Sequence, residues 1–344
     1  MFLLDSTSAM ISKNKILIFG LFVSTSFSQE VKWMSIGDLH NWYSAAGCEI
    51  ETGRTGQVSD QQDGLRYPAF YRVQDNQAAK GLWLGATNFY DPVVDKDYEY
   101  KVIHAGPRHL DIENETMPVN MTMDGKYDHP NVFVDGDPAT NLQYLDKVDN
   151  VDPSLPSDRR INNIVQTSIG VQMKRTIYAF AHPEHQNYHI QEYVFTNNGC
   201  FDADCNTSYE QTLEGFQVYL QYRYAISREG MVYDGNWLPQ SAAWGHNTMN
   251  DVIGEHPDAP TINDQFYDNG EIMRALFSWQ GYHSDASFDN LGGPNAPGEG
   301  HLGAAQFVGV VTLHADTSPT DNTDNINQPS TTWFITSDDP TTSG

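Results

Sequence analysis

The chain has 344 residues, of which 39% are hydrophobic and 12% aromatic, so it holds enough apolar material for a substantial core. Acidic side chains outnumber basic ones by 45 to 19, which gives a formal charge of −26 at pH 7. A protein of this charge is repelled by phosphate backbones and anionic lipid, so the composition excludes nucleic acid and makes a membrane surface a poor partner.

The first 29 residues have the pattern of a secretion signal. Lys13 and Lys15 precede an apolar run from Ile16 to Val23, and small residues follow up to Ser28. The run is much shorter than the ~20 residues that a membrane-spanning helix needs. We therefore predict a Sec-type signal peptide over 1–29, export of the rest to the cell surface or the extracellular space, and no membrane insertion after cleavage.

Short β-type runs separated by turn residues follow along the chain, and no long segment has a helical period. The clearest runs are Gly81–Ala86, Tyr98–His104, Ile177–Ala181, Tyr188–Thr196, Phe216–Tyr224 and Phe307–Leu313. In Phe216–Tyr224 the apolar residues alternate with polar ones, which is typical of a half-buried strand. Many strands without intervening helices predict an all-β protein, an antiparallel β-sandwich built as one large or two packed sandwiches, with long acidic loops.

Composition divides the exported part into four regions. We expect an N-terminal β region over 30–110, an acidic excursion or linker rich in Asp and Pro over 111–160, a main β-sandwich over 161–315, and a polar C-terminal segment over 316–344.

The N-terminal region contains Gly37-Asp38-Leu39-His40, a motif that resembles the first ligand set of dinuclear metallophosphoesterases. A carboxylate and an imidazole at this spacing can share one metal ion. The later motifs and the helices of such enzymes are missing. We therefore favour a polar turn, and keep a metal-dependent hydrolase using Asp38 and His40 as a second alternative.

Acidic loops suggest calcium, which takes six to eight oxygen ligands from carboxylates and carbonyls. The candidates are Asp135 and Asp137 in the acidic excursion, and Asp202 and Asp204 further along. Asp321 and Asp324 near the end of the chain are of the same kind. No loop has the spacing of an EF-hand, and solvated surface charge explains each of these runs equally well.

His182, Glu184, His185 and His189 form a histidine-rich segment. Imidazoles at these spacings bind a transition metal if the segment curls into a helix. Pro183 and the strand-like run from Tyr188 argue against a helix, so we expect a solvent-exposed loop that leads into a strand.

Cys200 and Cys205 bracket four residues, and in an oxidising compartment we expect them to form a disulfide. Cys48 is then left unpaired.

Trp237, Trp244 and Trp279 flank a region rich in Gly, Asn and Asp, where loops can present aromatic rings to a glycan. Trp83 reads as a core residue instead. Carboxylates such as Glu271 and Asp285 are available for acid–base chemistry, but no nucleophile elbow, phosphate loop or zinc-protease motif accompanies them.

Several segments resemble a group of uncharacterised secreted proteins of the Bacteroidota and neighbouring phyla, often exported by the type IX system. The resemblance rests on strand and turn motifs, namely Leu65-Arg66-Tyr67-Pro68, Gly81–Ala86, Ile190–Gly199, Phe216–Tyr224, Gly309–Asp316 and Gln328-Pro329. It implies a β-sandwich surface or secreted protein, with no catalytic residues to carry over.

The leading hypothesis is a secreted or cell-surface, non-catalytic β-sandwich of structural or adhesive type, with calcium as a candidate stabilising ion and other cell-surface proteins or a polysaccharide as partners. The first alternative is a glycan-binding module or a glycan-active enzyme.

Overall fold

The computed structural model describes residues 30–50, 65–70, 75–106, 115–129, 133–138, 146–224, 231–233, 236–238, 248–253, 274–280 and 307–329. The predicted signal segment 1–29 lies outside these residues. All regular elements within them are β-strands, so the protein is all-β, as the sequence predicts. In this part of the chain no helix is long and apolar enough to cross a membrane.

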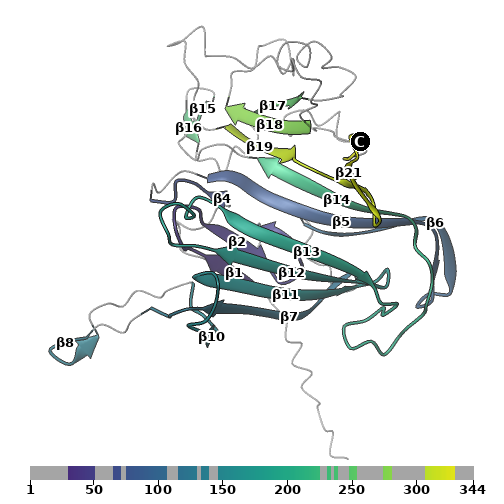
Figure 1. Ribbon diagram of the computed structural model, residues 1–344, viewed down its shortest axis with the longest axis horizontal. Helices are drawn as coiled ribbons and strands as arrows, with labels where there is room; N and C mark the ends of the chain where they lie inside the picture. Colours follow the sequence, from purple (N-terminus) through teal and green to yellow (C-terminus); the bar gives the residue numbers. More distant parts are fainter. Residues whose placement is uncertain are drawn as a thin grey trace, which may run out of the picture.

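One five-stranded sheet, here called the central sheet, has the strand order β10-β7-β11-β12-β13 (Figure 1). Its strands are β10 (Asn150–Val151), β7 (Thr116–Gly125), β11 (Arg159–Thr167), β12 (Val171–Ala179) and β13 (His189–Asn197). Neighbouring strands are antiparallel except for β10 and β7, which are parallel.

The second five-stranded sheet, the β5 sheet, is organised around the 17-residue strand β5 (Asp75–Asp91). On one side β5 pairs with β14 (Glu214–Tyr224), and on the other with β6 (Lys96–Ala105), β3 (Glu49–Ile50) and β4 (Leu65–Arg66). All of these pairs are antiparallel.

The remaining strands form small antiparallel sheets. They are β1 (Val31–Met34) with β2 (Asn41–Ser44), β8 (Phe133–Val134) with β9 (Asp137–Pro138), β15 (Met231–Tyr233) with β16 (Asn236–Leu238), β17 (Thr248–Ile253) with β18 (Arg274–Gln280) and β19 (Phe307–Thr312), and β20 (Asp316–Ser318) with β21 (Asp321–Asp324).

The stretch 111–160, which the sequence marked as an excursion or linker, contributes β7 to the central sheet, where it pairs with β10 on one side and with β11 on the other. The physical reason is that Met121 and Met123 alternate with polar residues and are buried in the core. Of its acidic residues, Asp124 lies on β7 itself and is buried, whereas Asp135 and Asp137 are exposed in the β8–β9 hairpin.

The central sheet buries one face, because its side chains alternate with period two. On β12, Val171, Met173 and Ile177 point inward and are buried, while Lys174 between them is exposed. On β13 the residues that point the other way, such as Glu192, are exposed.

Two other sheets cover different parts of this inner face. At one end Leu82, Leu84 and Phe89 of β5 share a hydrophobic cluster with Val165 of β11 and Met173 of β12. At the other end the β1–β2 hairpin packs there, since a second cluster joins side chains of β1, β2, β7, β11 and β12, namely Met34, Tyr43, Met121, Met123, Ile161 and Ile177.

Between the two apolar clusters, a row of polar side chains crosses the inner face. Arg175 of β12 is fully buried and lies opposite Asn163 of β11. Its guanidinium donates hydrogen bonds to the carbonyls of Ser44 (2.7 Å) and Gly47 (2.9 Å) and to the side chain of Asn163 (3.0 Å). Asn163 in turn donates to the carbonyl of Ala45 (2.9 Å). The row therefore satisfies backbone carbonyls of the β2–β3 turn, which would otherwise be buried without partners.

The row continues into a buried ion pair between Glu49 of β3 and Lys80 of β5, whose charged atoms are 2.7 Å apart. Lys80 also donates to Gln191 (3.2 Å) and to the Tyr193 hydroxyl (3.1 Å), both on β13 of the central sheet. Asn41 of β2 donates to the carboxylate of Glu49 at 2.7 Å. One ion pair thus connects three sheets.

Both partners of the pair are charged at neutral pH. Burial alone raises the pKa of Glu49, but the Lys80 charge, followed by Arg175 and Asn41, overcomes burial and holds the pKa below its usual range. Burial alone lowers the pKa of Lys80, but the Glu49 charge holds it above its usual range. The contribution of Glu49 to stability is present above its unfolded-state pKa of about 4.3 and is lost as pH falls, and that of Lys80 is present below about pH 10.4 and is lost as pH rises.

Replacing Glu49 by Gln leaves the Lys80 ammonium buried without its counter-charge. We expect Glu49→Gln to lower the free energy of unfolding at pH 7 by about 3–5 kcal/mol, measured by urea denaturation followed by tryptophan fluorescence. The difference from the unsubstituted chain is expected to be largest between about pH 5 and pH 10 and to shrink outside that window.

Glu192→Gln on β13 is the matched control, because Glu192 is exposed. It is expected to change stability by no more than about 0.5 kcal/mol. Equal effects of the two substitutions would contradict a structural role of the ion pair.

Candidate functional site

The Gly37–His40 motif and the histidine-rich segment, far apart in sequence, pack against each other. The backbone N–H of Asp38 donates to the carbonyl of Gln186 (2.9 Å), and the Gln186 side chain donates to the Asp38 carboxylate (2.9 Å). Gly37 permits this approach, since it has φ +77° and a Cβ there would lie 2.6 Å from the Gln186 carbonyl oxygen.

Asp38 and His40 themselves are engaged by the surrounding backbone and side chains. The Nε2 atom of His40 lies 3.1 Å from the carbonyl of Gly37. Burial lowers the pKa of His40 to about 4, with the Arg66 charge acting in the same direction, so this imidazole is neutral at pH 7. Neither residue belongs to the one group of His, Cys, Asp and Glu side chains that is suitably placed for a metal ion within the described residues.

His189, the first residue of β13, is also held within the fold. Its Nδ1 atom lies 2.9 Å from the hydroxyl of Tyr43. Burial, followed by the nearby His40, lowers the pKa of His189 to about 4. His189 is therefore a neutral packing residue and does not join the other histidines of its segment.

The group with metal-ligand geometry consists of His182, Glu184 and His185, all exposed. One ligand atom from each residue lies within 4.8 Å of the others. The segment forms a turn and not a helix: the N–H of His185 donates to the carbonyl of His182 (2.8 Å), and β13 begins at His189. The loop that the sequence predicts is therefore present. From the sequence we expect these side chains to converge only if the segment forms a helix, but a tight turn brings them together instead.

The predicted calcium ligands lie in two separate loops. Asp135 and Asp137 are exposed in the β8–β9 hairpin. Asp202 accepts hydrogen bonds from the backbone N–H groups of Asn206 (2.9 Å) and Thr207 (2.6 Å), which hold the pKa of its carboxyl below its usual range. Asp204 is exposed and donates its backbone N–H to Asp202 (3.1 Å). The carboxylate oxygens of Asp202 thus accept hydrogen bonds from the backbone of their own loop.

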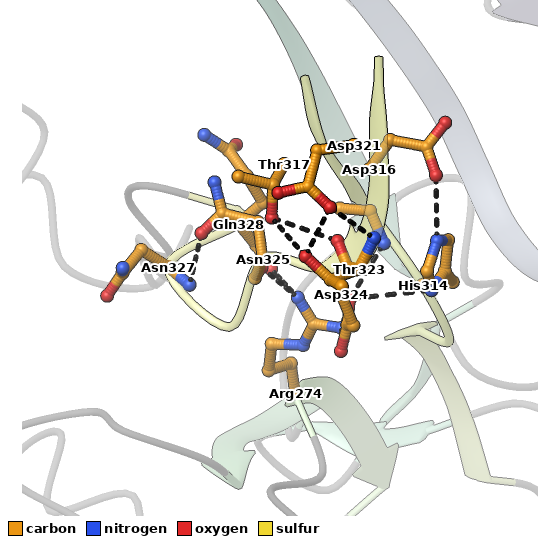
Figure 2. Close-up of polar contacts among 11 residues, drawn as sticks. Arg274, His314, Asp316, Thr317, Asp321, Thr323, Asp324, Asn325, Asn327 and Gln328 are labelled. Carbon is orange, nitrogen blue, oxygen red and sulfur yellow. Dashed lines mark hydrogen bonds and ion pairs between the residues drawn. The ribbon is translucent and has the colours of Figure 1, made fainter. Parts of the chain in front are cut away.

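A similar arrangement occupies Asp321 and Asp324 in the β20–β21 hairpin (Figure 2). Asp324 accepts two hydrogen bonds from Arg274, at 2.9 and 2.8 Å, and one from the backbone N–H of Ala315. Asp321 accepts from the backbone and the hydroxyl of Thr323. Arg274 therefore supplies the positive charge of this acidic cluster.

Two of the three cysteines form a disulfide and the third is free. Cys200 and Cys205 are joined by a disulfide, with their Cα atoms 4.8 Å apart. Cys48 is a free, buried cysteine, and burial raises the pKa of its thiol.

Of the three predicted glycan-binding tryptophans, two lie in described strands and one does not. Trp244 lies outside the described residues. Trp237 and Trp279 are described in their backbone only, as members of β16 and β18.

Trp83, which the sequence suggested as a core residue, is half-buried on the outer face of the β5 sheet. The correction has a simple cause: Leu82 and Leu84 enter the core, so the residue between them points the other way. The Trp83 ring is 5.2 Å from that of His104 and 5.8 Å from that of Tyr219, where the two planes meet at 71°. The alternation in Gly81–Gly85 was the signal that could have placed it.

Comparisons with known proteins identify no relative. No family model matches the chain, and neither a curated protein nor a solved structure is similar to it.

Proposed function

We propose that this chain is a secreted or cell-surface β-sandwich protein of structural or adhesive type that does not act as an enzyme. One observation carries the proposal: each buried charged side chain of the described residues has a partner within the fold. The pairs and contacts are Glu49 with Lys80, Asp91 with Lys101, Asp124 with Arg160, Asp146 with His129, Arg66 with Trp33, Arg159 with Tyr127, and Arg175 with the β2–β3 turn. Catalytic groups instead need charge or basicity directed at a substrate.

The sandwich arrangement is supported by how the sheets share their cores. The β5 sheet and the β1–β2 hairpin both contribute side chains to clusters on the inner face of the central sheet. Two sheets that bury facing sides against one another are the arrangement of a β-sandwich.

An adhesive role is supported by apolar side chains on the outer faces. Ile190 and Val194 of β13 are 48% and 45% exposed, and Tyr100 and Val102 of β6 are 69% and 53% exposed. Exposed apolar side chains provide area that contact with another molecule can bury. The partners that fit are other cell-surface proteins or a polysaccharide.

Export is the part of this proposal that a reporter tests directly. Fusing residues 1–29 to alkaline phosphatase, which is active only outside the cytoplasm, is expected to give active enzyme in a bacterial host. Interrupting the apolar run with Leu17→Arg and Phe19→Asp is expected to abolish that activity. An inactive unsubstituted fusion would overturn the secreted assignment.

A second candidate is glycan binding at the outer face of the β5 sheet, and Trp83 is the observation that favours it. Gly81 and Gly85 flank Trp83 on the same face and have no side chains to cover its ring. Tyr219 is 42% exposed and meets Trp83 edge-on, so the two rings form a corner against which one sugar ring fits. Aromatic faces of this kind bind the apolar side of a sugar while neighbouring polar groups bind its hydroxyls.

Binding to a panel of polysaccharides, with calcium and with chelator, tests this second candidate. If one polymer binds saturably, Trp83→Ala and Tyr219→Ala are each expected to weaken binding at least tenfold, which corresponds to about 1.4 kcal/mol. Phe133→Ala is the control, since Phe133 is 60% exposed in the β8–β9 hairpin, which lies away from the β5 sheet (Figure 1). Equal losses from all three variants, or no loss from any, would contradict binding at this face.

A further inference from the structure

The turn that contains His182, Glu184 and His185 combines two imidazoles with one carboxylate on a short stretch of backbone. One ligand atom from each of the three residues lies within 4.8 Å of the others, a separation that a single ion at about 2.0–2.2 Å from each ligand can bridge after small rotations of exposed side chains. All three residues are exposed, so an ion can reach them from solvent.

The ligand types indicate which metal fits. Two nitrogen donors and one oxygen donor suit zinc, copper or nickel, whereas calcium and magnesium require sets made almost wholly of oxygen. Two histidines and one glutamate form a known three-ligand set for zinc, in which water completes the coordination.

The neighbours of the turn orient the histidine rings. The Nδ1 atom of His185 lies 2.6 Å from the hydroxyl of Tyr188, which leaves its Nε2 atom for a metal. The ring of Phe180 lies 6.0 Å from that of His185. His182 accepts a hydrogen bond at Nδ1 from the backbone N–H of Glu184, at 3.2 Å. If His182 binds through Nε2, its proton moves to Nδ1 and this long hydrogen bond opens.

The turn is also fixed to the body of the protein, which makes its geometry reproducible. Gln186, the residue after His185, exchanges two hydrogen bonds with Asp38, both 2.9 Å long. The strand β13 follows from His189. The ligands therefore sit on a turn that is anchored at its C-terminal side by a sheet and by a second loop.

We propose that His182, Glu184 and His185 bind one divalent transition-metal ion, with zinc as the best fit. The ion joins the three side chains and so fixes the turn where it packs against the Gly37–His40 motif. The role of this site is binding and local stabilisation, and it is separate from the adhesive surfaces of the proposed function.

Zinc titration of the full chain, without a histidine tag, tests the proposal by isothermal calorimetry, with Co²⁺ absorption as a second probe. We expect saturable binding, and we expect His182→Ala and His185→Ala each to lower the zinc affinity by at least about 10-fold. Loss of even an outer-shell partner of a metal ligand typically lowers affinity by about 10-fold to 100-fold. Glu184→Gln is expected to weaken binding as well, and calcium in excess is not expected to compete.

His314→Ala is the matched control, since His314 is an exposed histidine outside the group and its removal is expected to leave zinc affinity unchanged. Circular dichroism of each variant checks that the substitution at an exposed turn leaves the fold intact. Two results would overturn the proposal: no zinc binding by the unsubstituted chain at about 0.1 mM, a concentration matching about −5.5 kcal/mol of binding, or undiminished binding by the His182→Ala/His185→Ala double variant.

Discussion

The buried polar row from Asn163 through Arg175 to the Lys80–Glu49 pair is the interaction on which the rest of the fold depends. Arg175 and Asn163 lie on the buried face of the central sheet, between its two apolar clusters, and their donors match carbonyls of the β2–β3 turn. Lys80 extends the same row to Gln191 and so couples the β5 sheet to the central sheet. Apolar packing is tolerant of small shifts, but buried charges are stable only with their partners in place. The row therefore determines where the hairpin and the β5 sheet sit on the central sheet.

In this arrangement the buried charged side chains stabilise the fold, and other side chains, on the surface, are available to other molecules. Because the buried charged side chains bind one another and the backbone, the chemistry that reaches solvent comes from side chains on turns and outer faces. The His182–His185 turn and the ring of Trp83 are the two clearest examples. The β20–β21 hairpin shows the same pairing of charges near the surface. One arginine, Arg274, binds the carboxylate of Asp324 and orders the loop around it (Figure 2). The exterior groups, and not the buried charges, are therefore the candidates for binding that the proposed structural or adhesive role requires.

The alternation of apolar and polar residues along the chain predicted where strands form. It did not predict which residues far apart in the sequence contact one another. Alternation in Phe216–Tyr224 and the apolar run Gly81–Ala86 indicated β14 and β5, since a half-buried strand has period two. The inward side of β5 follows from the positions of Leu82 and Leu84, whereas Trp83 was predicted to be a core residue as part of the Gly81–Gly85 run. Glu49, Lys80 and Gln191 showed no signal, because their contacts depend on how sheets pack and not on spacing along the chain. The sequence indicated the histidine-rich segment and its exposed loop, but not that one turn brings His182, Glu184 and His185 together, because the i to i+3 contact of a single turn leaves no periodic trace.

Native-state hydrogen exchange measures most directly whether the polar row makes the sheets one cooperative unit. The amides of β5, β11, β12 and β13 are compared in the unsubstituted chain as denaturant is raised. The account predicts that the slowest amides of the β5 sheet and of the central sheet converge on one opening free energy, equal to that of global unfolding. Opening of the β5 sheet at a clearly lower free energy, with the central sheet still protected, would contradict it, because the ion pair would then not couple the two sheets.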